Sequence, residues 1–119
     1  MGIRSFQDLT VWQKSMKLAK GIYELCLSLP SDQKFGLISQ MQRCAVSIPS
    51  NIAEGSKRGS VKDFAQFLRI ARGSAAELET QLLLAKDIYN LNIAETLALL
   101  KEVQKMLEVF IQRLLKTAN

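Results

Sequence analysis

The chain has 119 residues and a formal net charge of +5, and 48% of its residues are hydrophobic while 23% are charged. This length predicts one domain over residues 1–119, and the composition is typical of a soluble globular protein. Histidine is absent, so the commonest general base and the commonest metal ligand are both missing. The composition therefore argues against hydrolytic chemistry and against a zinc site, although a carboxylate-based enzyme stays open.

The first half of the chain predicts two helices. The first is expected over residues 8–28 and is closed by Pro30. The second is expected over residues 33–56, because its apolar period continues through Pro49, and Gly55 would end it. A proline inside a helix removes one backbone hydrogen bond, so we predict a kink at Pro49. The apolar positions that carry these periods are Leu9, Trp12, Met16, Ala19, Tyr23, Cys26, Leu37, Met41, Cys44, Ile48 and Ile52.

The second half predicts two longer helices, over residues 60–89 and 93–117. Ser60 precedes the first of these and Asn92 the second, and each is followed three residues later by an acidic residue, which is the pattern of an N-terminal cap. Four long helices with short links predict an all-α, up-down-up-down antiparallel four-helix bundle. The heptad positions of the third helix are Val61, Phe64, Leu68, Ala71, Ala75, Leu78, Leu82, Ala85 and Tyr89.

Three features of the sequence indicate the cellular location of the protein. No run of eighteen apolar residues is present, and the opening MGIRSFQDL lacks the apolar stretch of a secretion signal. Cys26 and Cys44 lie far apart in apolar surroundings, which predicts buried free thiols rather than a disulfide. We expect a cytoplasmic protein that does not enter a membrane and that holds neither a metal nor a cofactor.

The positive charge is unevenly placed, because residues 1–72 hold eleven Lys/Arg and five Asp/Glu while residues 73–119 hold five and six. Such an excess favours a face that binds phosphate groups, although ordinary solvated surface charge is the alternative. No aromatic residues alternate with these cations, so base stacking is not expected. The candidate nucleic-acid-binding residues are Lys14, Lys17, Lys57, Arg58, Lys62, Arg69 and Arg72.

A second set of residues is assigned to structure or to contacts between protomers. Polar residues on the second and third helices predict a hydrogen-bonded network, either within the chain or across an interface. A catalytic pair would use Glu54 and Glu77, but no residue nearby would hold a metal or a substrate. Aromatic residues would anchor the packing, and small residues would let another helix approach. The set consists of Trp12, Arg43, Pro49, Asn51, Glu54, Gly55, Phe67, Gly73, Ser74 and Glu77.

Three stretches closely resemble one known family: FQDLTVWQKSMKLAKGIY at 6–23, FGLISQMQRCAVSIPSNIAEGSKR at 35–58 and DFAQFLRIARGSAAELETQL at 63–82. The family consists of four-helix bundle proteins encoded in intervening sequences of bacterial 23S rRNA genes, and it includes the accessory variability determinant of diversity-generating retroelements. The resemblance implies a ring-shaped homopentamer with a basic surface that binds RNA or DNA. That binding is best supported for the retroelement members, which work with a reverse transcriptase, whereas for the intervening-sequence members the resemblance implies no clear activity.

The residues and the resemblance together predict a non-enzymatic, oligomeric four-helix bundle that binds nucleic acid through a basic surface. The alternative is a protein-interaction adaptor or scaffold, docking for example on a reverse transcriptase without touching nucleic acid itself. Binding that weakens steeply with salt would favour the first function. Capture of a partner protein without nucleic acid would favour the second.

Overall fold

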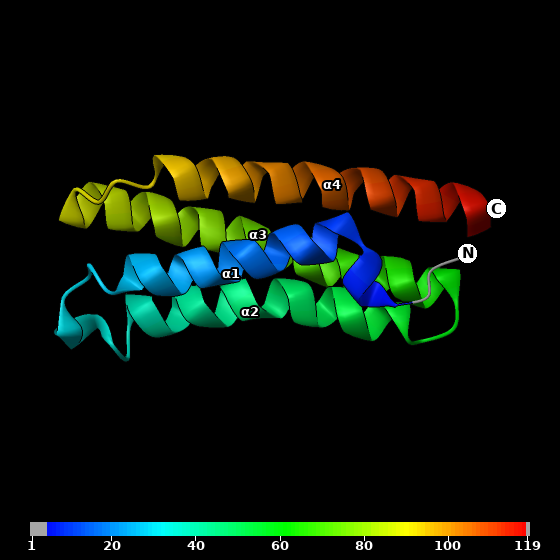
Figure 1. Cartoon of the computed structure of the whole chain (residues 1–119), viewed down its shortest axis with the longest axis horizontal. Helices are drawn as coiled ribbons and strands as arrows, with labels where there is room; N and C mark the ends of the chain where they lie inside the picture. Colours follow the sequence, from blue (N-terminus) through cyan, green and yellow to red (C-terminus); the bar gives the residue numbers. More distant parts are fainter. Residues whose placement is uncertain (1–4, 119) are drawn as a thin grey trace.

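The computed structural model describes residues 5–118 and contains no β-strand within that range (Figure 1). Four α-helices form the molecule: α1 spans Thr10–Cys26, α2 spans Leu37–Ser56, α3 spans Val61–Tyr89 and α4 spans Ala94–Ala118. Two short 3₁₀ helices, η1 at Phe6–Asp8 and η2 at Ser31–Gln33, precede α1 and α2. The predicted all-α class with four helices is confirmed.

The helices lie side by side along the long axis of a molecule that measures 47 × 19 × 19 Å (Figure 1). The α1–α2 and α3–α4 links lie at one end, and the α2–α3 link lies at the other. Each helix packs against the next one in sequence, and α1 also packs against α4. No helix of the described part is long and apolar enough to cross a membrane.

The core follows the predicted heptad seam of α3. Its inner positions are buried, whereas Val61 and Tyr89 at the two ends are only half-buried. Burial of a large apolar side chain contributes roughly 1.5–3 kcal/mol, so this seam is the main contribution of α3 to stability. The buried residues of the seam are Phe64, Leu68, Ala71, Ala75, Leu78, Leu82 and Ala85.

The first two helices begin later than predicted. Residues 6–8 form a 3₁₀ turn capped by the Ser5 side chain, and extended backbone at Leu9 separates that turn from α1. The second helix begins at Leu37 rather than at residue 33, because Gly36 has φ −110° and ψ −112°, outside the helical region. The apolar period alone does not show these interruptions of the backbone.

The predicted caps of the later helices are present. The Ser60 hydroxyl accepts a hydrogen bond from the Asp63 backbone N–H at 3.0 Å, and α3 begins directly after it. At the other end of α3, Asn90 has φ 54°, a left-handed conformation that ends helices. The Asn92 side chain accepts from the N–H of Ala94, the first residue of α4, at 3.2 Å, one residue earlier than the predicted partner Glu95.

The prediction for Gly55 was wrong. The second helix continues past it to Ser56, and the left-handed turn falls at Gly59, which has φ +85°. Gly55 is buried inside α2, where a Cβ atom would lie 2.6 Å from Cβ of Phe67 and 3.0 Å from Cδ1 of Phe64. Glycine at this position therefore lets α2 and α3 approach closely. Pro49 also lies inside α2 and is buried.

Candidate nucleic-acid interface

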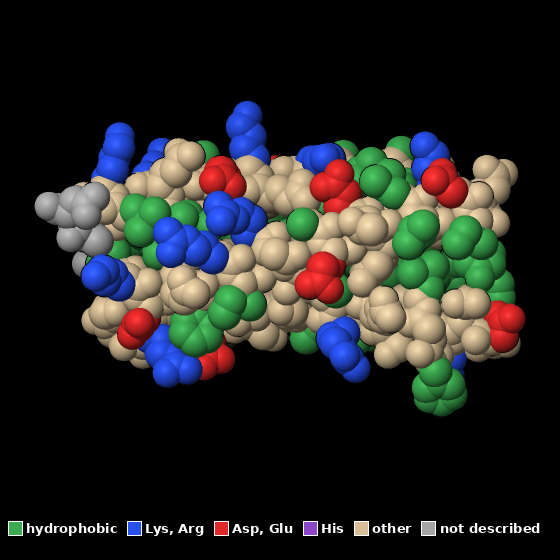
Figure 2. All heavy atoms as spheres, turned by 180° about the vertical axis from the view of Figure 1, so that it is seen from behind, with side chains coloured by type: hydrophobic (Ala, Val, Ile, Leu, Met, Phe, Trp, Pro, Cys, Tyr) green, Lys and Arg blue, Asp and Glu red, His purple; other side chains and the backbone are tan. Residues whose placement is uncertain are grey.

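The positive charge gathers at the end of the bundle that carries the α2–α3 link. Residues 57–72, which form this link and the start of α3, hold five Lys/Arg and one Asp/Glu. Figure 2 shows the Lys and Arg side chains gathered towards this end and hydrophobic side chains gathered at the opposite one. The asymmetry seen along the sequence is therefore an asymmetry along the long axis.

Two of the predicted phosphate-binding residues are bound to carboxylates on α4. Lys14 Nζ lies 2.7 Å from Glu102 Oε1, and this pair joins α1 to α4. Arg72 Nη1 donates to both carboxylate oxygens of Glu108, at 3.0 and 3.1 Å, and joins α3 to α4. Because their charges are already neutralised, Lys14 and Arg72 offer less to a phosphate than the sequence suggests.

Four of the predicted residues, Lys17, Lys57, Lys62 and Arg69, are exposed and form no ion pair within residues 5–118. Lys57 directly follows α2 and Lys62 lies in the first turn of α3. Arg69 lies seven residues after Lys62, so the two share one side of α3 about 10 Å apart along its axis. Lys17 lies apart from them, in the groove between α1 and α4.

Three further cations at this end were missed in the sequence. Lys105, Arg113 and Lys116 belong to α4, are exposed and form no ion pair within the described part of the chain. Their half of the sequence carries no net positive charge, so a count along the chain passes over them. In the bundle, α4 packs beside the start of α3: the rings of Phe64 and Phe110 meet edge-on, with their centroids 5.1 Å apart.

Arg58, the remaining predicted contact, lies against an aromatic ring. Its Cζ atom is 4.8 Å from the centroid of the Phe67 ring, and Nη2 donates to Oε2 of Glu54. Phe67 itself is half-buried between α2 and α3. An aromatic ring therefore lies beneath a cation at this end of the bundle, although no aromatic residues alternate with the cations in the sequence.

The predicted polar network forms only in part. Asn51 Nδ2 donates to the Ser47 carbonyl at 2.8 Å and to the Ser47 hydroxyl at 2.9 Å, and that hydroxyl shares a 2.8 Å hydrogen bond with the hydroxyl of Ser74. These bonds tie α2 to α3 near Pro49. Glu54 is bound to Arg58 instead and takes no part.

The two carboxylates of the possible catalytic pair have separate partners. Glu77 Oε2 lies 3.7 Å from the thiol sulfur of Cys44, which in turn accepts from Gln81 Nε2 at 3.4 Å. Burial is the main cause that raises the pKa of the Cys44 thiol, and the Glu77 charge raises it further. Arg43, predicted to join this group, is exposed without an ion pair in the described range.

Two residues of the structural set, Trp12 and Gly73, differ in burial. Trp12 is half-buried and meets the Phe6 ring edge-on at 5.3 Å. Gly73 is exposed, and a Cβ atom there would meet nothing within 4 Å. The next residue, Ser74, shares a hydrogen bond with Ser47 of α2, so the predicted helix contact in this run of small residues is present at Ser74.

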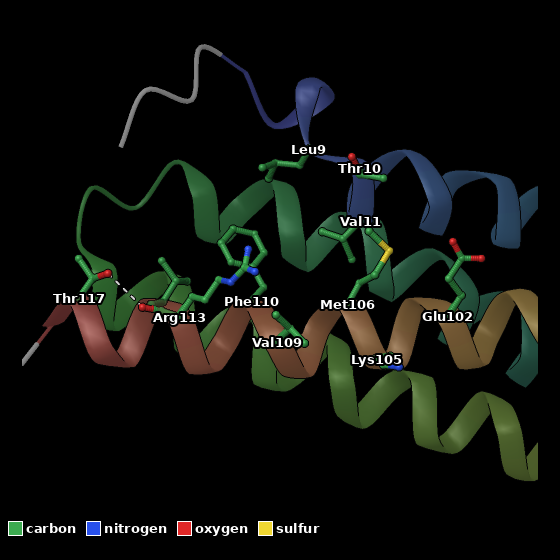
Figure 3. A pocket seen from close by; sticks show the side chains of 11 residues that line it. Leu9, Thr10, Val11, Glu102, Lys105, Met106, Val109, Phe110, Arg113 and Thr117 are labelled. Carbon is green, nitrogen blue, oxygen red and sulfur yellow. Dashed lines mark hydrogen bonds between the residues drawn. The ribbon is translucent and has the colours of Figure 1, made fainter.

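The described residues contain no group of three or more metal-ligating His, Cys, Asp or Glu side chains. A shallow groove runs between the start of α1 and the last turns of α4 (Figure 3). Its floor is apolar and includes Leu9, Met106 and Val109, and Lys105 and Arg113 stand along it. The groove offers contact surface, and the one carboxylate of its lining, Glu102, is paired with Lys14.

The comparison with known proteins decides the family. A family model described as 23S rRNA-intervening sequence protein matches residues 7–110. The chain belongs to this family. A crystal structure of a protein of unknown function from the S23 ribosomal protein family of Bacteroides thetaiotaomicron VPI-5482 is similar in fold, with a TM-score of 0.75 and 30% sequence identity over 86% of this chain and 95% of that one. No curated protein matches the chain.

The family match covers every residue of the candidate interface that the sequence predicted. It ends at residue 110, so Arg113 and Lys116 lie beyond it. These two cations are therefore features of this chain that the family match does not include. The interface consequently combines residues from the matched part of the bundle with the last turns of α4.

Proposed function

We propose that this member of the 23S rRNA-intervening sequence protein family is a non-enzymatic, oligomeric protein that binds RNA or DNA phosphates at one end of its bundle. The observation that carries the proposal is the set of exposed cations without an ion pair in the described chain, here called the basic end. Sequence-independent binding to phosphates requires a spread of accessible cations and little else. The basic end consists of Lys57, Lys62, Arg69, Lys105, Arg113 and Lys116.

The non-enzymatic part of the proposal has its own support. The sequence lacks histidine. Glu54 is bound to Arg58 and Glu77 lies near the Cys44 thiol, so the two carboxylates do not face a common site. General acid–base catalysis needs such groups within hydrogen-bonding reach of one reacting atom.

The oligomer proposed is the homopentamer that the family resemblance implies. Two exposed apolar side chains on α3 support it: Ile70 is 46% exposed and Leu84 is 47% exposed, and the surface at Gly73, close to Ile70, is open. A ring would present five basic ends together, which raises avidity because later contacts are intramolecular. Light scattering should give about five times the 13.3 kDa chain mass, and a stable monomer at micromolar concentration would contradict the ring.

The proposal includes the up-down-up-down direction of the helices, a kink at Pro49 and a cytoplasmic location, the last supported by the buried free thiols.

A protein-interaction adaptor is the second candidate function, and exposed apolar residues at the opposite end favour it. Phe35 is 91% exposed and Leu27 is 86% exposed, both at the α1–α2 link, while Ile88 near the end of α3 is 63% exposed. Large apolar side chains in such positions are typical of contact surfaces for proteins. The partner would be another protein, for example a reverse transcriptase, and the two functions are compatible because they use different ends.

The experiment that tests the first function is a salt titration of fluorescently labelled RNA and DNA against the wild-type protein. We expect binding with little sequence preference that weakens steeply as salt rises, with roughly −0.9 in log–log slope for each phosphate neutralised on duplex DNA. Absence of binding even at low salt would contradict nucleic-acid binding and leave the adaptor function. Partner capture that persists after nuclease treatment would support the adaptor.

A further inference from the structure

Arg58 is held in place by two contacts that the binding of phosphate does not require. Its guanidinium lies over the Phe67 ring, with Cζ 4.8 Å from the ring centroid, and one edge donates to the Glu54 carboxylate. A guanidinium is planar and is attracted to the face of an aromatic ring. The two contacts fix one face and one edge of the group, which reduces the entropy that a ligand would otherwise lose in ordering it.

The rest of the Arg58 side chain remains accessible. The side chain is 50% exposed in spite of both contacts. The next residue, Gly59, has no side chain, and a Cβ atom there would meet nothing within 4 Å. A flat ligand has room to approach the guanidinium from solvent.

Cations for a charged backbone lie next to this position along the α2–α3 link. Lys57 directly precedes Arg58, and Lys62 follows in the first turn of α3, and both are exposed without an ion pair in the described chain. A ligand that combines a flat group with regularly spaced negative charges would match this arrangement. An unpaired nucleotide in a strand has both features.

We infer that Arg58, backed by Phe67, is a stacking platform for one unpaired base of single-stranded RNA or DNA, whose phosphates bind Lys57 and Lys62. The inference rests on the proposed function and names the class of nucleic acid that the basic end prefers. Proteins stack unpaired bases on aromatic rings and on guanidinium planes, whereas the bases of a duplex are stacked on one another and do not reach such a platform. Charge alone would favour the duplex, because its phosphates are more densely spaced.

The test measures the affinity for a short single-stranded RNA containing 2-aminopurine and for the same sequence as a duplex. The wild type should bind the single strand about tenfold more tightly and should quench the 2-aminopurine fluorescence, which reports stacking. Arg58→Lys keeps the charge but removes the planar group, so the single-strand affinity should fall about tenfold while the duplex affinity stays unchanged. Arg43→Lys is the matched control, since Arg43 is exposed, forms no ion pair in the described chain and lies outside the basic end; it should keep the preference.

Phe67→Leu provides a second variant, because it removes the ring beneath Arg58 and leaves every charge in place. It should lose the single-strand preference. Circular dichroism checks that the Phe67→Leu protein keeps its helices. If the helices are lost, the Arg58→Lys variant alone tests the platform. Equal wild-type binding of both forms, or an Arg58→Lys protein that keeps the preference and the quenching, would overturn the platform while phosphate binding stands. Absence of wild-type binding to either form would refute the proposed function and the platform together.

Discussion

A Cβ atom at Gly55 would lie 2.6 Å from Cβ of Phe67, closer than two such carbons approach in real proteins. This close contact of α2 with α3 places the Phe67 ring beneath Arg58, which follows α2 after one further residue. The position of the Arg58 guanidinium therefore depends on a glycine three residues before it. The stretch EGSKR at 54–58 contributes to the packing of the bundle and to the candidate interface together.

Gly55→Ala should destabilise the protein, although alanine is the better helix former. The new methyl group must displace the Cβ of Phe67, which is attached to the α3 backbone, so we expect a loss of about 1–3 kcal/mol in the free energy of unfolding. Gly21→Ala is the control: a Cβ atom at this position inside α1 would meet nothing within 4 Å, so the change should stabilise by roughly 0.5–1 kcal/mol. Urea denaturation of the two variants measures both values, and a Gly55→Ala protein as stable as the wild type would show that the contact relaxes freely.

Glu79 should make the stability depend on pH. Its carboxylate accepts hydrogen bonds from Lys101 Nζ at 2.7 Å and Gln104 Nε2 at 2.9 Å, and these bonds lower its pKa in the folded state, the bond from Lys101 most. Because the folded pKa lies below the unfolded value of about 4.3, the Glu79 carboxylate contributes fully to the free energy of unfolding above that pH. This contribution is lost as the pH falls through the folded pKa. Glu79→Gln should therefore flatten the fall in stability on acidification. Glu24→Gln, at an exposed residue without an ion pair in the described chain, should leave that fall unchanged; an equal response of both variants would contradict the assignment.

The two cysteines should be unreactive in the folded protein. Cys26 is 4% exposed and Cys44 is 8% exposed, and burial raises the pKa of both thiols. The thiolate is the reactive form, so alkylation by iodoacetamide at neutral pH should be at least about tenfold slower in the folded protein than in urea. Mass spectrometry counts the modified thiols over time. Rapid labelling of the native protein at either position would mean that the bundle opens readily there.

The sequence predicted the helices well where a regular apolar period and a capping residue coincide. The seam of α3 and its Ser60 cap are both present, because burial of one helix face and satisfaction of free N–H groups are local needs that leave a local pattern. The starts of α1 and α2 were placed too early. Their interruptions at Leu9 and Gly36 are backbone conformations that no side-chain period encodes.

The candidate site was harder to predict, because it depends on which residues become neighbours after folding. Arg72 is a cation on an exposed face in the sequence, but the bundle brings Glu108 of α4 to it. Arg113 belongs to a half of the chain without net positive charge, yet it lies at the basic end. The ion pair of Arg72 and the position of Arg113 both depend on contacts between residues far apart in the sequence. A single sequence does not show which of these residues meet.

Nucleic acid is proposed to bind at the basic end, and three cations of the basic end allow a direct test of that binding. Lys57 lies on the α2–α3 link, Lys62 and Arg69 lie on α3, and all three are exposed and form no ion pair in the described chain. Their simultaneous replacement by glutamine removes three charges without removing a buried contact. The helicity and the oligomeric mass should stay unchanged.

The deciding measurement is the slope of log affinity against log salt for duplex DNA, in the wild type, in this triple variant and in a matched triple variant of the opposite half. The matched variant replaces Lys20, Lys34 and Lys86, which are also exposed and form no ion pair in the described chain, by glutamine. We predict that the basic-end variant loses up to about 0.9 of slope for each cation removed and binds all sequences more weakly, while the matched variant keeps the slope of the wild type. Equal slopes in the two variants would contradict a binding site at the basic end.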